Sequence, residues 1–178
     1  ILRCLVGSEM CIRDRADRSV ININIICVGK LKEQFLRDGC AEYLKRLSPY
    51  AKTQITEVAE ERASENPSAA EIKNILEKEG TRIEEKIPKG AAVIPLCIEG
   101  KEFSSPEFAA EIEKISLVSS KIVFVIGGSF GLSDKVKALG KIKLSFGKIT
   151  LPHQLARLVL TEQIYRAFSI INNSRYHK

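Results

Sequence analysis

The chain has 178 residues, of which 44% are hydrophobic and 28% are charged. This length suits one domain, and this composition is typical of a globular protein and excludes a disordered or low-complexity chain. The sequence has no apolar run of about 18 residues, so we expect no membrane-spanning helix. The five cysteines follow no metal-ligand spacing, so we expect no disulfide framework, no metal site and a reducing, cytoplasmic setting.

The net charge of +6 is concentrated near the C-terminus. Residues 135–178 hold nine Lys or Arg residues and one acidic residue, Glu162. A basic segment on a near-neutral body favours an anionic partner such as nucleic acid. A solvated basic face without a partner explains the charge equally well.

Residues 1–20 do not read like the rest of the chain, because they show no regular hydrophobic period. The stretch CLVGSEMCIRDR resembles a translated sequencing adapter joined in frame, and a natural disordered extension is the alternative. We therefore expect residues 1–20 to be an artefactual or disordered N-terminal extension and residues 21–178 to form one folded domain.

The first half of the domain alternates strand and helix patterns. We expect a strand over 23–29, an amphipathic helix over 31–47 and a strand over 53–59. Ser68 is followed three residues later by Glu71, which predicts a capping box and a helix that runs towards Ile87.

The second half continues the alternation. A strand is expected over 91–100, although Pro95 removes a ladder donor and must lie at a bulge, at an edge or near the strand end. Ser105 and Pro106 then begin a helix, and 121–128 reads as a strand buried on both faces. Ser133 is a plausible cap of a short helix, and we expect a fifth strand over 141–146.

The longest helical pattern, over 149–168, is apolar on several faces, which is typical of a buried helix. Pro152 suits its first turn, and the free N–H groups there form a natural anion site. Polar residues interrupt the pattern, each of which is either a satisfied structural contact or part of a site: His153, Gln154, Arg157, Glu162, Gln163 and Arg166.

Five alternations of strand and helix predict an α/β fold with a mainly parallel sheet flanked by helices. In such a sheet, ligands bind beyond the carboxyl ends of the strands. Three strand ends carry glycines or loop signals, over 96–100, 126–131 and 146–148. The run GGSFG is not a dinucleotide fingerprint, so these glycines alone indicate simple turns more readily than a site.

The chain ends in Arg175, Tyr176, His177 and Lys178. An aromatic ring flanked by cations suits base stacking and phosphate contact, whereas an unstructured end is the alternative. His153 and His177 are the two histidines of the sequence, too few for a metal site.

Several segments together resemble the RlmH family, the large-subunit ribosomal RNA pseudouridine methyltransferases of the SPOUT class. The resemblance spans residues 21–178 and is carried by FVIGGSFGLS, by LSFGKITLPHQLARLVLTEQIYRAF and by the terminal YHK. Further similarity lies in INIICVGKLKEQF, AEYLKRLSPY, KEG, IEGK and SSPEFA.

The resemblance implies a SPOUT α/β fold with a C-terminal deep trefoil knot, and a homodimer with the long helix at its interface. It implies methylation of N3 of a pseudouridine in 23S rRNA, on assembled ribosomes, with S-adenosylmethionine as cofactor. The cofactor pocket carried over by motif comprises Leu96, Gly127, Phe146, Gly147, Lys148, Ile149, Thr150 and Leu151.

Methyl transfer to N3 requires in-line positioning and an acceptor for the N3 proton. We expect His177 to act as the base, Tyr176 to stack the target base, and Arg166 and Arg175 to hold phosphates or the developing anion. Water is the alternative proton acceptor. The rival functions are a non-catalytic ribosome-binding factor and a nucleotide-binding flavodoxin-like module.

Overall fold

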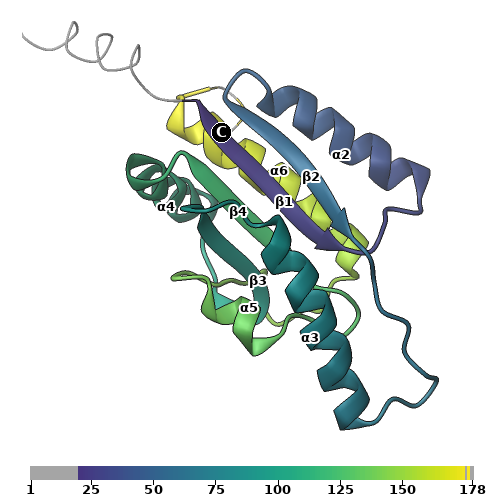
Figure 1. Cartoon of the computed structure of the whole chain (residues 1–178). Coiled ribbons are helices and arrows are strands. Elements are labelled where there is room, and N and C mark those ends of the chain that lie inside the picture. The colour runs from purple at the N-terminus through teal and green to yellow at the C-terminus, as the bar shows by residue number, and fades with distance from the viewer. Residues whose placement is uncertain (1–19, 175, 177–178) are drawn as a thin grey trace, which may run out of the picture.

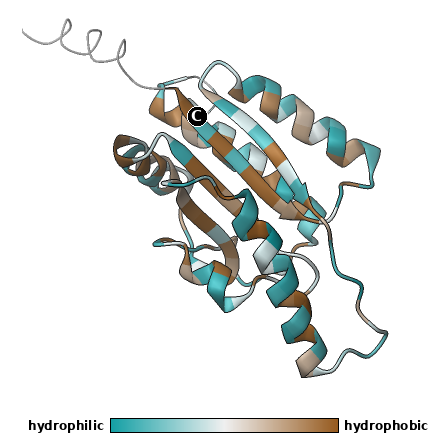
Figure 2. Cartoon of the chain, in the orientation of Figure 1, coloured by the Kyte–Doolittle hydropathy of each residue, from teal (hydrophilic) through white to brown (hydrophobic). Residues whose placement is uncertain are grey.

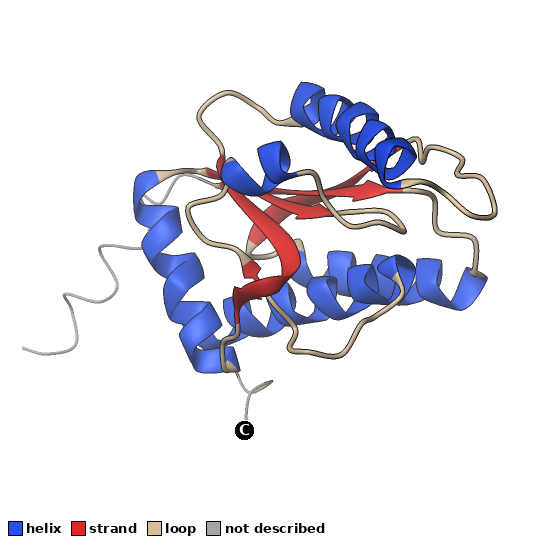
Figure 3. Ribbon diagram, turned by 90° about the horizontal axis from the view of Figure 1, so that it is seen from below, coloured by secondary structure: helices blue, strands red, loops and turns tan. Residues whose placement is uncertain are grey.

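The computed structural model describes residues 20–174 and 176 and consists of a parallel sheet between two layers of helices (Figures 1 and 3). Four strands lie in the order β2-β1-β4-β3, and every neighbouring pair is parallel. The strands are β1 (Ile21–Val28), β2 (Ala51–Val58), β3 (Ala92–Lys101) and β4 (Lys121–Ile126). The predicted α/β class with a mainly parallel sheet is confirmed; the knot stays a prediction.

The helices divide between the two faces of the sheet. One face is covered by α2 (Gln34–Leu47), α4 (Ser105–Val118) and α6 (His153–Ile171), and the other by α3 (Ala69–Lys86) and α5 (Asp134–Ala138). Isoleucines alternate between the two cores along β1, since Ile23 and Ile25 face α6 whereas Ile26 faces α3. Hydrophobic residues are accordingly concentrated on the central strands and the inner sides of the helices (Figure 2).

Helix starts follow the local chemistry of the sequence. Ser68 and Ser133 each accept a hydrogen bond from a backbone N–H of the first turn, at Glu71 and Val136, as the sequence predicts. The reciprocal half of the expected capping box is wrong, because the Glu71 carboxylate accepts from Ser64 instead. A complete capping box is formed by Ser104 and Glu107 at the start of α4.

The expected fifth strand over 141–146 is wrong. Beyond Pro95, β3 leaves β4, and its outer half meets this segment through isolated bridges from Leu144 to Leu96 and Lys101. Such short contacts do not make a ladder, so the segment is an extended connection along β3. Pro95 lies on the edge strand and at the end of the β3–β4 ladder, where a missing N–H is tolerated.

Helix α6 runs antiparallel to the strands and carries a buried arginine. It begins at His153, directly after Pro152, and continues to Ile171, three residues beyond the predicted end. The Arg157 side chain is fully buried, donating to the Glu57 carboxylate (2.6 Å) and to the Gly29 carbonyl oxygen (2.8 Å). It therefore links α6 to the ends of β1 and β2.

Removing the carboxylate partner tests the importance of this buried contact. We expect Glu57→Ala to lower the free energy of unfolding by about 3 kcal/mol, because it leaves a buried guanidinium unpaired. Burial raises the pKa of Glu57, but the hydrogen bonds from Arg157 and from the Leu31 N–H outweigh it and lower that pKa overall. The wild-type contribution is therefore present at neutral pH and is lost as the pH falls through this lowered pKa.

Urea denaturation at fixed protein concentration measures the effect. The matched control is Glu42→Ala, which removes a carboxylate 2.8 Å from Arg46 in a pair whose side chains are 51% and 45% exposed. We expect that control to cost less than about 1 kcal/mol. Equal losses in the two variants would contradict the structural role of Arg157.

Candidate functional site: a cavity at the carboxyl ends of β3 and β4

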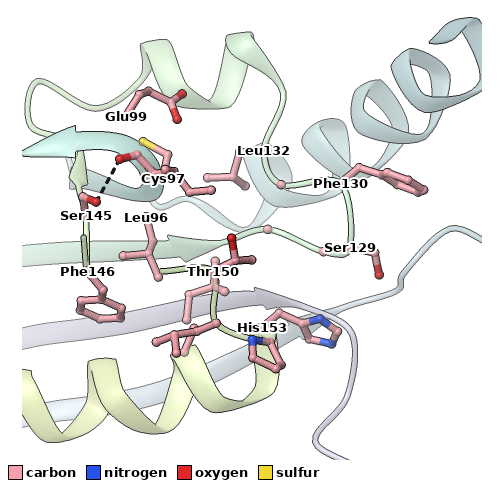
Figure 4. Close-up of a pocket in the computed structure, with 18 of the residues that line it drawn as sticks. Leu96, Cys97, Glu99, Ser129, Phe130, Leu132, Ser145, Phe146, Thr150 and His153 are labelled. Carbon is pink, nitrogen blue, oxygen red and sulfur yellow. Dashed lines mark hydrogen bonds between the residues drawn. The ribbon is translucent and has the colours of Figure 1, made fainter. Parts of the chain in front are cut away.

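A cavity of about 690 Å³ lies at the carboxyl ends of β3 and β4 and at the start of α6. Figure 4 shows the lining side chains between β3 and α6. This volume matches a pocket for a small molecule or cofactor. The cavity lies where a parallel α/β sheet is expected to bind ligands, because the strand ends and their loops leave space there.

Seven of the eight residues expected in a cofactor pocket line this cavity. They are Leu96, Gly127, Phe146, Gly147, Ile149, Thr150 and Leu151. The eighth, Lys148, is exposed and is not part of the lining. The three strand ends singled out in the sequence therefore meet at one edge of the sheet, although their role in cofactor binding stays a prediction.

The loop after β4 is a tight turn closed by its own backbone. The Gly131 N–H donates to the Gly128 carbonyl oxygen over 3.1 Å, and Gly131 has a positive φ of 84°. A Cβ placed on Gly127 would lie 2.2 Å from the Gly131 carbonyl oxygen. Glycine at 127 is therefore required by the turn itself.

Carboxylates from the β2–α3 connection and from α3 support this loop. Ser129 donates through its hydroxyl to Glu60 over 2.9 Å, and Glu79 accepts from the Glu61 N–H over 2.9 Å. Glu79 is 3% exposed and lies against Gly128, and its burial raises the pKa of its carboxyl group. The loop is thus fixed to the β2–α3 connection.

The segment before α6 is held by Ser145. Its hydroxyl donates to the Ile98 carbonyl oxygen over 3.0 Å and accepts from the Gly147 N–H over 3.1 Å (Figure 4). Gly147 has a φ of 97°, which favours glycine. These contacts keep the backbone of residues 146–151 along the cavity, where it leads directly into the first turn of α6.

The residues expected to carry catalysis lie elsewhere or outside the described residues. Arg166 is 13 positions after His153, so it lies about 20 Å further along α6, at the opposite edge of the sheet. Its guanidinium is paired with Glu162 over 2.6 Å, and the Tyr176 ring lies over it at 5.0 Å. Arg175 and His177 fall outside the described residues.

Tyr176 packs against α6. Its ring centroid is 4.6 Å from that of Tyr165, and its hydroxyl donates to Glu162 over 3.2 Å. Burial raises the pKa of Tyr176 to about 12, and the neighbouring Tyr43 and Glu162 act in the same direction. Tyr176 therefore contributes to the packing around α6.

Several lining residues were missed in the sequence. The most informative are Cys97, Glu99, Phe130 and Lys137, whereas His153, which the sequence named as a structural or site residue, lines the cavity as well. Their signal was positional, since they lie on or directly beside the strand ends that carry the recognised motif. Glu99 on β3 and Lys137 on α5 form an ion pair over 2.5 Å, which sequence spacing does not reveal.

Neither a metal-binding cluster nor a membrane-spanning helix occurs among the described residues. Residues 20–174 and 176 contain no group of three or more His, Cys, Asp or Glu side chains placed to hold a metal ion. Within the same range, every helix is too short or too polar to cross a membrane.

A parallel α/β sheet with a cofactor-sized cavity at its carboxyl edge defines a nucleotide- or cofactor-binding class of α/β protein. The profile of a family described as "Predicted SPOUT methyltransferase" matches residues 21–177. The chain belongs to this family of SPOUT methyltransferases.

Named relatives agree with this assignment. The chain is 56% identical over 159 residues to "Ribosomal RNA large subunit methyltransferase H" of Listeria monocytogenes serotype 4b, covering 89% of this chain and 100% of the relative. Proteins of the same name from Listeria welshimeri and Bacillus thuringiensis are 55% and 54% identical, with the same coverage. The resemblance to the RlmH family is thereby confirmed.

The tight turn after β4 gives a direct test. We expect Gly127→Ala to lower the free energy of unfolding by about 3 kcal/mol, because its Cβ would overlap backbone that cannot move independently. The control is Gly90→Ala, at a positive φ of 76° with no neighbouring atom within 4 Å of the new Cβ. Strain alone should cost that variant about 1 kcal/mol. If urea denaturation gives equal losses, the turn tolerates a side chain at 127.

Proposed function

We propose that the chain is an S-adenosylmethionine-dependent methyltransferase that modifies N3 of a pseudouridine in large-subunit (23S) ribosomal RNA. The observation that carries the proposal is the meeting of three motif-bearing strand ends around one cofactor-sized cavity. The family assignment and the names of the relatives support the reaction class and the RNA substrate. We assign the activity to residues 21–178, and we assign no role to residues 1–20.

The cavity fits a nucleoside cofactor in both size and chemistry. Its walls include Leu96, Ile98, Phe146, Ile149 and Leu151, which offer apolar contact to a purine and ribose. Backbone groups of the 146–151 segment supply hydrogen bonds of the kind that fix a base. When bound, the cofactor supplies a methyl group on a positively charged sulfur, and the protein needs only to position the acceptor atom in line.

The substrate is an anion, and the protein offers positive charge in its C-terminal quarter. Lys141, Lys143 and Lys148 belong to the segment between α5 and α6 that borders the cavity. Phosphate contacts of this kind fix the position of an RNA without reading its sequence. We also propose that the enzyme acts on assembled ribosomes, in the cytoplasm.

We further propose a homodimer that combines the tail of one subunit with the cavity of the other. Phe35, Ile149 and Leu155 are 67%, 77% and 37% exposed on the side of the molecule formed by α2 and the start of α6. Apolar side chains exposed together favour a protein interface. Because Tyr176 packs beside Arg166, about 20 Å along α6 from the cavity, a two-fold partner would provide a route by which His177 reaches the reacting atoms.

The rival function is a ribosome-binding factor without catalysis. It shares the basic surface but gives no reason for an ordered cavity of about 690 Å³ at the strand ends. It predicts RNA binding with no affinity for the cofactor. A flavodoxin-like nucleotide module would need a phosphate loop, and none of the three strand ends provides one.

Calorimetry with S-adenosylmethionine tests the proposal. We expect one cofactor per chain to bind with micromolar affinity, and binding to persist in EDTA, because the described residues hold no cluster of three or more His, Cys, Asp or Glu side chains placed for a metal ion. The control is the same titration with ATP, whose triphosphate has no matching loop here. Absence of cofactor binding would favour the ribosome-binding factor, and loss of binding in EDTA with recovery on adding a divalent ion would contradict a metal-free site.

The tail gives the second test. We expect His177→Ala to reduce the methylation rate about 100-fold if His177 accepts the N3 proton, with cofactor affinity unchanged. The measurement is transfer of a tritiated methyl group to ribosomes that lack the modification, with sedimentation to verify that the oligomeric state is the same. His153→Ala is the comparison, since His153 lines the cavity of its own chain. Full activity of His177→Ala together with an inactive His153→Ala would transfer the role to His153.

A further inference from the structure

The wall of the cavity contains one ion pair. Among its described lining residues, Glu99 and Lys137 are the two that carry a full charge at neutral pH, and His153 is the other titratable group apart from Cys97. The Lys137 ammonium group lies 2.5 Å from the Glu99 carboxylate. Apart from these four, the lining residues are apolar or uncharged polar, so this pair is the place in the described lining that offers both signs of charge.

The pair sits at the mouth of the cavity rather than inside it. The Glu99 side chain is 54% exposed and the Lys137 side chain is 22% exposed. Glu99 projects from the outer half of β3 towards α5 (Figure 4). The hydrogen bond between them lowers the pKa of Glu99 and raises the pKa of Lys137, so both groups stay charged over a wide pH range.

The fold has little need of this pair. A half-exposed ion pair contributes little to stability because water solvates both partners. Helix α5 is already held by its Ser133 cap, by the fully buried Val136 and by the pair between Lys135 and Glu84. Glu99 and Lys137 are therefore free to exchange or share their partners with a ligand at small cost.

The proposed cofactor has one zwitterionic end. Its amino-acid moiety carries a carboxylate and an ammonium group on the same carbon, whereas its nucleoside end is neutral. A lysine and a glutamate in contact present the complementary charges at the same spacing. A lysine ammonium has three donors, so it can hold the Glu99 carboxylate and a ligand carboxylate at once.

We propose that Glu99 and Lys137 form the subsite for the amino-acid end of the cofactor, with Lys137 binding its carboxylate and Glu99 its ammonium group. This inference rests on the proposed function and assigns the orientation of the ligand: the nucleoside lies against the apolar wall and the amino-acid end lies towards α5. The four charges then alternate in sign around the contact, which favours the zwitterion over either a simple anion or a simple cation.

Truncated ligands separate this role from a structural one. Calorimetry would compare S-adenosylhomocysteine, which has the complete amino-acid end, with 5′-methylthioadenosine, which lacks it, and with decarboxylated S-adenosylmethionine, which keeps the ammonium group alone. We expect Lys137→Met to weaken S-adenosylhomocysteine about 10- to 100-fold and to leave the other two ligands unchanged. Glu99→Gln should weaken both ligands that carry the ammonium group and leave 5′-methylthioadenosine unchanged.

Lys135→Met is the matched control, because Lys135 lies on the same helix, is paired with Glu84 and does not line the cavity. It should leave all three affinities unchanged. Equal weakening of 5′-methylthioadenosine and S-adenosylhomocysteine by Lys137→Met would show a structural effect and overturn the inference, as would no weakening of either. If the wild type binds S-adenosylhomocysteine but the variants give either of these contradicting results, the subsite is wrong and the proposed function survives. If the wild type binds none of the three nucleosides, the subsite and the proposed function are both wrong.

Discussion

The fully buried guanidinium of Arg157 is the contact on which the arrangement of the cavity depends. An arginine is buried in a core only when its charge and its donors are matched, since an unpaired charge in an apolar interior costs several kcal/mol. Here Glu57 supplies the charge and the Gly29 carbonyl oxygen accepts a second hydrogen bond. Both partners lie at the carboxyl ends of β2 and β1, so the first turns of α6 are fixed at that edge of the sheet.

The position of the cavity follows from that attachment. Because α6 starts at the carboxyl edge, the segment 145–152 that leads into it must pass along the ends of β3 and β4. Ser145 fixes this segment to the β3 backbone, and the turn at Gly127 and Gly131 keeps the β4 exit compact. The space left between these three loops is the cavity. The same constraint sends the other end of α6 to the opposite edge, with Arg166 and Tyr176.

Local patterns in the sequence were sufficient for the layers and for the edge at which the cavity lies. Period-two and period-3.6 patterns located all four strands and the helices that separate them, because burial on one or two faces dictates those patterns. Parallel strands bring their carboxyl ends together, so motifs far apart in the chain predicted one shared site. The fifth strand was predicted wrongly, since whether KIKLSF pairs depends on how far β3 diverges from β4 after Pro95.

What the sequence could not predict are contacts between side chains that are distant in the chain. Arg157 with Glu57, and Lys137 with Glu99, have no spacing that marks them, and both were recognised only when the strands and helices were placed together. The two pairs also differ in a way that only burial decides. The Arg157 guanidinium is fully buried, which gives that pair a structural role although Glu57 is 34% exposed, whereas both partners of the Lys137 pair are partly exposed beside the cavity. Arg166 is a further case in which the sequence does not reveal a side-chain contact. Its charge looked available in the sequence, yet Glu162 pairs with it and the Tyr176 ring covers it. A role for Arg166 in RNA contact would therefore require Glu162 to release it, and the RNA phosphate would have to compete with a carboxylate only one helical turn away.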